Sequence, residues 1–148
     1  MGTEYRLPVY RVELVREKSL KSQVRTISAP VEVASVFEKL HANTDRESLV
    51  VLCLDTKHGV RAINTVSIGD LSSAIVSPRE VFKPAILANS ANIILIHNHP
   101  SGDPSPSRED IQITRRIAEC GRLLDIELLD HVVVADSGYV SLKERGLL

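Results

Sequence analysis

The sequence predicts an α/β domain in which helices pack on both faces of a mixed β-sheet. The first observation is a pair of short apolar segments, residues 49–54 and 92–96, that do not alternate between apolar and polar residues. Such runs are typical of central strands that are covered on both faces. The second observation is the order of the predicted elements, β-α-β-β-α-β-α-β followed by a short final strand, which implies a mixed sheet with helices packed against it.

The N-terminal region predicts one strand and one helix. Residues 9–17 alternate loosely between apolar and charged side chains, as a half-solvated edge strand does. Further along, Ser28 is a candidate helix cap, Pro30 suits the first turn, and apolar residues then recur with helical spacing. We therefore expect an N-terminal edge strand or extension over residues 1–24 and a single globular domain over residues 25–148.

The remaining elements follow from apolar patterning and from residues that start or stop helices. Residues 47–55 are too apolar and β-branched for a surface helix, and a turn joins them to a strand that Gly69 ends. Ser77, Pro78 and Glu80 form a helix start signal. The predicted elements after residue 59 are a strand at 60–68, a helix at 77–89, a strand at 92–96, a helix at 107–120 capped by Gly121, and strands at 126–135 and 138–142.

Composition excludes several classes of function. The 148 residues carry 18 basic and 19 acidic side chains, and only 3% of the residues are aromatic. A near-neutral, aromatic-poor chain lacks the basic surface and the stacking platform of a dedicated nucleic-acid binder. The residual charge is uneven, with +3 on residues 1–28 and −4 on the rest. Two widely spaced cysteines and the lack of a long apolar run predict a soluble cytoplasmic protein without disulfides or a membrane span.

One fifteen-residue window, residues 96–110, carries the chemistry. His97 and His99 lie two apart at the end of a predicted strand, so both imidazoles point to the same side. Asp110 falls in the first turn of the next helix, three residues after Ser107. Two imidazoles and one carboxylate would leave a fourth position open on a tetrahedral Zn²⁺ ion. Taken singly, a histidine at a strand end is more often structural, and S-x-x-D is also a helix capping box.

The same window resembles a known signature. The run H-N-H-P-S-G-D-P-S-P-S-R-E-D is similar to the JAMM/MPN metalloprotease motif, H-x-H-P followed by S-x-x-D, and most closely to its RadC-like branch. Segments 66–69, 77–83 and 129–131 also resemble that branch. The similarity covers roughly residues 25–146. It implies a three-layer, cytidine-deaminase-like fold and hydrolysis of peptide or isopeptide bonds in a peptide or protein substrate.

The resemblance also implies roles for individual residues. It makes His97, His99 and Asp110 ligands of a zinc ion. The upstream glutamate of the family, which serves as general base, falls best on Glu47, with Glu38 and Glu32 as alternatives. Ser107 would orient the water or stabilise the oxyanion.

A rival hypothesis is a metal-stabilised, non-proteolytic binding module tied to DNA repair or mobile-element biology. Full-length RadC-like proteins often carry a helix-hairpin-helix segment, and we expect none in the 25 or so residues ahead of the matching region. The charge balance of the whole chain does not support DNA binding, although the basic segment over residues 1–28 could still contact DNA. A zinc deaminase is excluded because its H-x-E and P-C-x-x-C motifs are absent.

Two further expectations concern strands. The edge strand at residues 9–17 could pair between two subunits and form a homodimer. Asp130 and His131 are adjacent in an apolar strand, so their side chains should lie on opposite faces and at most one can reach the metal. A structural, hydrogen-bonded pair is the favoured interpretation, with an auxiliary or substrate-contacting role at the metal site as the alternative.

Overall fold

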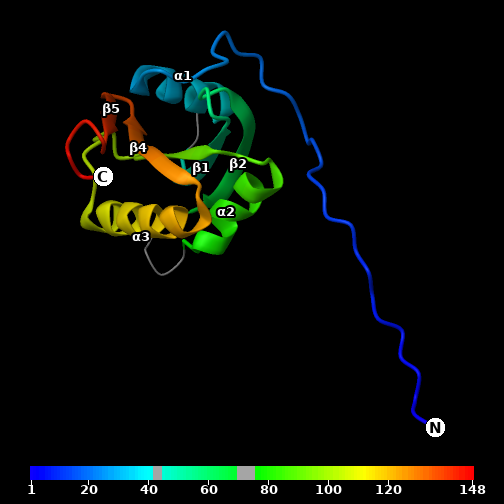
Figure 1. Ribbon diagram of the computed structural model, residues 1–148. Coiled ribbons are helices and arrows are strands. Elements are labelled where there is room, and N and C mark those ends of the chain that lie inside the picture. The colour runs from blue at the N-terminus through cyan, green and yellow to red at the C-terminus, as the bar shows by residue number, and fades with distance from the viewer. Residues whose placement is uncertain (42–44, 70–75) are drawn as a thin grey trace.

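A five-stranded mixed sheet lies at the centre of the protein, as the computed structural model shows over residues 1–41, 45–69 and 76–148 (Figure 1). The elements are α1 (Pro30–Leu40), β1 (Ser48–Leu54), β2 (Val60–Ile68), α2 (Pro78–Leu87), β3 (Asn92–Asn98), α3 (Arg108–Leu124), β4 (Glu127–Ala135) and β5 (Gly138–Ser141). The strand order is β2-β1-β3-β4-β5. Among the described strands, β3 and β4 pair in parallel and all other pairs are antiparallel. The predicted mixed α/β sheet is confirmed.

The helices cover the sheet from both sides and give three layers. Helix α1 packs on one face, and α2 and α3 pack together on the other (Figure 1). Alternate residues of the central strands feed two separate cores: Val51 and Leu95 lie in the core under α2 and α3, whereas Val50 and Ile94 lie in the core under α1. Every residue of β1 is buried. This double coverage explains why β1 and β3 lack an apolar–polar alternation.

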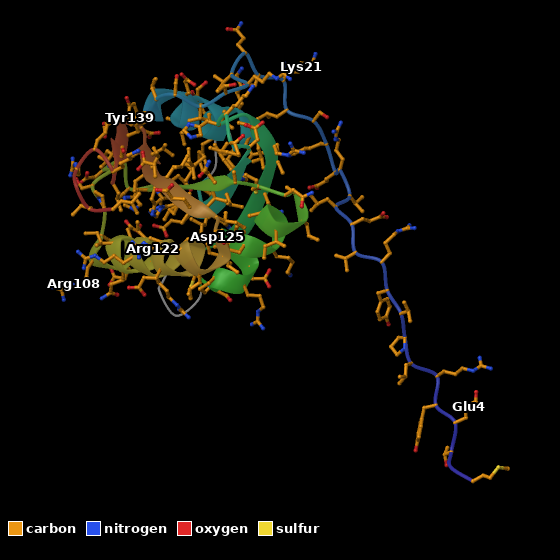
Figure 2. The ribbon with its side chains drawn as sticks, viewed as in Figure 1. Glu4, Lys21, Arg108, Arg122, Asp125 and Tyr139 are labelled. Atoms are coloured by element: carbon orange, nitrogen blue, oxygen red, sulfur yellow. The ribbon has the colours of Figure 1, made fainter. Side chains whose placement is uncertain are left out.

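The expected edge strand at residues 9–17 is not formed. Residues 1–19 are all exposed and adopt no regular secondary structure, and this segment runs away from the sheet, with Glu4 near its far end (Figures 1 and 2). The chain first pairs with the sheet at Thr26, which forms a single antiparallel bridge with Gly59, the residue before β2. Alternation predicts which face of a strand would be buried, but a strand also needs a neighbour that takes up its backbone hydrogen bonds.

Two predicted helix boundaries are also wrong. The N-cap residue of α1 is Ala29, and the Ser28 hydroxyl instead donates to the Glu32 carboxylate over 2.7 Å. Helix α3 does not end at Cys120 but continues to Leu124, and Asp125 takes the left-handed conformation at its C-cap (φ 55°). Among the described residues, no helix is long and apolar enough to cross a lipid bilayer.

Gly121 has a packing role in place of the predicted capping role. It is buried inside α3, and a Cβ atom at this position would overlap the backbone carbonyl oxygen of Ile126. The Gly121 carbonyl also accepts a 2.9 Å hydrogen bond from the Ile126 amide. This hydrogen bond holds the residue before β4 against α3, so the backbone cannot easily move away to make room for a side chain. The missing side chain lets the chain leave α3 and return directly into β4.

We predict that Gly121→Ala lowers the free energy of unfolding by about 1–3 kcal/mol, the usual cost of forcing extra volume into a packed interior. Chemical denaturation measures the change. Glu119→Ala, at an exposed position two residues earlier on α3, is the matched control and should stay within about 0.5 kcal/mol of the parent protein. An equal effect of both variants would contradict the packing role of Gly121.

Candidate metal centre

Strand β3 delivers the two histidines to one end of the sheet. His97 pairs with Leu49 of β1 on one side and with Val133 of β4 on the other. His99 follows β3 directly, and its amide donates to the Val134 carbonyl over 2.8 Å, which prolongs the β3–β4 ladder. His97 shares its face with Leu95, in the core under α2 and α3. Both imidazoles are therefore turned towards the N-terminus of α3.

Asp110 reaches the same place from the first turn of α3. The helix begins with a complete capping box: Ser107 Oγ accepts from the Asp110 amide over 3.1 Å, and Asp110 Oδ2 accepts from the Ser107 amide over 2.7 Å. This arrangement fixes the rotamer of the carboxylate. The Ser107 hydroxyl therefore lies next to the Asp110 carboxylate, at the N-terminus of α3.

The three side chains form a compact cluster that could hold a metal ion. The Nε2 atoms of His97 and His99 lie 2.9 Å apart, and each lies 3.1 Å from an oxygen of the Asp110 carboxylate. One ligand atom from each residue falls within 4.8 Å of the others. The side chains of His97 and Asp110 are almost fully buried, whereas that of His99 is 13% exposed. The cluster therefore opens to solvent beside His99.

The electrostatics of Asp110 favour its anionic form. Burial alone would raise the pKa of Asp110, but a hydrogen bond and positive charge from His97, with hydrogen bonds from Ser107, hold that pKa well below its usual range. The carboxylate is thus ionised at neutral pH and needs a positive charge beside it. A metal ion held by the cluster would supply that charge.

The hydrogen bonds of His99 suit a metal ligand. Its Nδ1 lies 2.9 Å from the backbone carbonyl oxygen of Asp103. A carbonyl only accepts, so Nδ1 is the donor and Nε2 of the neutral ring keeps its lone pair for the cluster. Histidines that bind metals commonly donate their other ring N–H to a backbone carbonyl in this way. The His99 lone pair, the His97 Nε2 atom and the Asp110 carboxylate then converge, and a set of two imidazoles and one carboxylate could hold a divalent metal.

The structure brings Glu47 to the same end of the sheet. Leu49 of β1 pairs antiparallel with His97, so two residues back along the chain the backbone reaches the level of His99. By alternation Glu47 belongs to the same face as Leu49 and His97. Asn98 lies between the two histidines in the sequence, and its side chain accepts from the Ser48 amide and donates to the Arg46 carbonyl, each over 2.8 Å. Asn98 thereby ties both neighbours of Glu47 to β3.

The alternative glutamates lie in a different layer. Glu32 and Glu38 belong to α1, which covers the face of the sheet opposite to α3 and Asp110. The Glu32 carboxylate accepts from both the amide and the hydroxyl of Ser28, and Glu38 is exposed. Of the three candidates, only Glu47 is positioned on the face that carries the histidines.

Asp130 and His131 lie on opposite faces of β4, as expected, but their surroundings differ. Asp130 accepts hydrogen bonds from the Ser141 hydroxyl and from two backbone amides, which is a structural role. His131 instead places its Nε2 2.7 Å from Nδ1 of His97. Burial, and then the nearby His97, lowers the pKa of His131 well below its usual range, so the ring is neutral. The interpretation of both residues as a purely structural pair misses this contact with the candidate metal ligand His97.

Two more residues at the site escaped the sequence interpretation. Asn98 occupies the x position of H-x-H, where the motif requires no particular residue type, so the motif gave no reason to single it out. Thr114 lies four residues after Asp110, on the same side of α3, and its hydroxyl contacts both the Asp110 carbonyl and His131. The i, i+4 spacing from Asp110 is the one signal in the sequence that could have indicated Thr114.

Comparison with known proteins agrees with this geometry. The RadC-like JAB domain family matches residues 27–147. A UPF0758 protein of Desulfitobacterium hafniense is 51% identical over 122 residues, which are 82% of this chain and 54% of the relative. A UPF0758 protein of Rubrobacter xylanophilus is 52% identical over 122 residues, which are 82% of this chain and 53% of the relative. A UPF0758 protein of Methanosarcina mazei is 46% identical over 138 residues, which are 92% of this chain and 60% of the relative.

The chain therefore spans little more than half the length of these curated relatives. The family match, in contrast, includes all five strands, all three helices and the cluster of His97, His99 and Asp110. The chain belongs to the RadC-like JAB domain family.

Proposed function

We propose that this domain is a zinc-dependent metallohydrolase that cleaves peptide or isopeptide bonds. The observation that carries the proposal is the convergence of two imidazole Nε2 atoms and one buried carboxylate within 4.8 Å, on the same face of the sheet as Glu47. Two neutral nitrogens and one carboxylate make a donor set that zinc accepts, with a fourth position left for water or substrate. Structural zinc sites usually fill all four positions with protein groups, so three ligands favour catalysis.

Each residue has a part in the proposed reaction. His97, His99 and Asp110 would hold the zinc, which when bound lowers the pKa of a water ligand from 15.7 to about 7 and polarises a carbonyl group. Glu47 would accept a proton from the attacking water and return it to the leaving amine. The Ser107 hydroxyl would donate to the substrate oxygen as negative charge develops on it, an interaction worth about 3–4 kcal/mol in comparable enzymes.

The partial exposure of His99 fits a macromolecular substrate. The side chain of His99 is the most accessible of the three proposed ligands, and the loop over residues 100–107 runs past it to α3. An extended peptide or a flexible isopeptide linkage could reach a site of this kind at the edge of the fold. Membership of a superfamily that includes metalloproteases supports the same class of reaction.

The test combines metal analysis with hydrolysis. The purified chain should contain about one zinc per molecule and should cleave quenched fluorescent peptides that carry either an α-peptide or a lysine isopeptide bond. A chelator should abolish the cleavage and added zinc should restore it. Zinc-free protein, or cleavage that a chelator does not affect, would overturn the proposal. Salt-dependent binding of DNA without any hydrolysis would instead favour the rival binding module.

A further inference from the structure

The hydrogen bonds of His97 raise a question that the three proposed ligands leave open. An imidazole binds a metal through a nitrogen that has no proton, so a neutral His97 must carry its proton on Nδ1 if Nε2 is to be the ligand atom. His99 satisfies this condition by donating its Nδ1–H to the Asp103 carbonyl. Within residues 1–41, 45–69 and 76–148, no carbonyl contacts the Nδ1 atom of His97. It faces His131 Nε2 at 2.7 Å instead.

The donor in this histidine pair depends on the far side of the His131 ring. There, His131 Nδ1 lies 2.6 Å from Thr114 Oγ1, and the same hydroxyl lies 2.7 Å from the Asp110 carbonyl oxygen. A hydroxyl has one proton. The carbonyl can only accept, so that proton lies between Thr114 and Asp110, and the Thr114 oxygen is left to accept from His131.

The opposite assignment fails at one contact. If Thr114 donated to His131, two oxygen atoms, Thr114 Oγ1 and the Asp110 carbonyl oxygen, would face each other at 2.7 Å with no proton between them. Such a contact is repulsive and is not relieved by water, because Thr114 is fully buried. The geometry therefore selects one direction for the whole series of hydrogen bonds.

We propose that Thr114 and His131 are positioning residues that hold the His97 ring with Nδ1 protonated and the Nε2 lone pair directed at the metal site. Thr114 donates to the Asp110 carbonyl and accepts from His131 Nδ1–H. His131 Nε2 then accepts from His97 Nδ1–H. The series joins α3, β4 and β3, beginning at the backbone of one proposed ligand and ending at the ring of another. The role of the two residues in metal binding rests on the proposed function. The direction of the hydrogen bonds follows from the geometry alone.

Both positioning residues are well suited to this role. Each is almost fully sealed from solvent, with His131 1% and Thr114 0% exposed, so water cannot replace either contact. His131 comes from the neighbouring strand, where it pairs with Leu95, two residues before His97 in β3. Outer hydrogen-bond partners of metal-binding histidines typically contribute 10–100-fold to metal affinity.

The decisive variant is Thr114→Val, which keeps the shape of the side chain and removes the acceptor for His131 Nδ1–H. His131 would then be expected to move its proton to Nε2, which would force His97 to carry its own proton on Nε2, the proposed ligand atom. We expect zinc affinity, measured by competition with a chromophoric chelator, to fall about 10–100-fold. Thr114→Ser, which keeps the hydroxyl, should restore it.

The matched control is Ser141→Ala. It removes a buried hydroxyl that donates to Asp130 on the opposite face of β4, so it should lower stability without changing zinc affinity. Equal zinc affinity in Thr114→Val and the parent protein would overturn the proposal. An equal loss of affinity in Ser141→Ala would do the same, because it would assign the effect to general destabilisation of the fold.

A second measurement needs neither bound metal nor a variant of Thr114. Long-range ¹H–¹⁵N spectra of the metal-free parent protein, labelled in its histidines, distinguish a protonated from an unprotonated ring nitrogen. We expect His97 and His131 both to be protonated at Nδ1, with signals assigned through His131→Gln. A His97 ring without a proton on Nδ1, or a His131 ring with a proton on Nε2, would overturn the proposal. A protein that binds no zinc would refute the proposed function, while these spectra would still decide the direction of the hydrogen bonds.

Discussion

Asp110→Ala should abolish zinc retention. The Asp110 carboxylate contacts both histidine Nε2 atoms over 3.1 Å and brings the one negative charge of the cluster, so its loss leaves only two neutral ligands. We expect zinc affinity to fall by more than about 100-fold, beyond the effect of losing an outer hydrogen-bond partner. Elemental analysis after gel filtration measures the retained zinc. Peptide hydrolysis should disappear with it.

The controls for this variant separate charge from helix capping. Asp110 also accepts from the Ser107 amide, so alanine will cost about 0.5–2 kcal/mol of stability through the lost cap contact. Asp110→Asn keeps an oxygen for that contact and should lose zinc without the loss of stability. Asp103→Ala removes an exposed carboxylate of the same loop, which accepts from the Ser105 amide and lies outside the cluster, and keeps the backbone carbonyl that contacts His99, so it should retain zinc. Normal zinc content in Asp110→Ala would refute the ligand assignment.

Glu47→Gln should keep zinc and lose turnover. Glutamine matches the shape of glutamate but cannot take up a proton, and positioned general bases typically contribute about 10²–10⁴-fold to the rate. We expect kcat to fall within that range while the zinc content and the thermal midpoint of unfolding stay unchanged. Fluorescent peptide cleavage and elemental analysis on the same preparation provide both readouts.

The other two glutamates supply matched controls for Glu47. Glu38→Gln changes an exposed side chain of α1 and should leave turnover at the parental level. Glu32→Gln weakens the contacts with Ser28 and should affect stability only. If Glu47→Gln retained full turnover and one of the α1 variants lost it, the general base would have to be assigned to α1.

Local patterns predicted most of the fold because they report burial and backbone conformation directly. The strand at residues 60–68 has the expected bounds, since Gly69 adopts a φ of 109° that other residues rarely tolerate. Gly121 shows the limit of such patterns. A glycine near the end of a helical repeat predicts a cap, yet here it is needed because β4 returns so closely against α3. That contact depends on where the next strand goes, and the helix sequence contains no signal for it.

The candidate site divides in the same way. H-x-H and S-x-x-D are short-range patterns whose geometry follows from a strand and a helix start, so His97, His99 and Asp110 could be identified from the sequence. His131 and Thr114 are 34 and 17 residues from the groups they contact, His97 and His131. Their roles depend on which strand lies beside β3, and in which register. The edge strand predicted at residues 9–17 failed for a related reason, because alternation does not supply a pairing partner.

The sequence by itself determined the α/β class, the central strands, the three converging side chains and the family resemblance, because each follows from residues that lie close together in the chain. Only the tertiary structure decided the rest. The register of β1 against β3 puts Glu47, and not the glutamates of α1, on the face of the histidines, and the register of β4 against β3 sets His131 beside His97. Hydrogen-bond direction and burial depend on distant groups meeting, and the proposed role of the histidine nitrogens as metal ligands rests on these two properties.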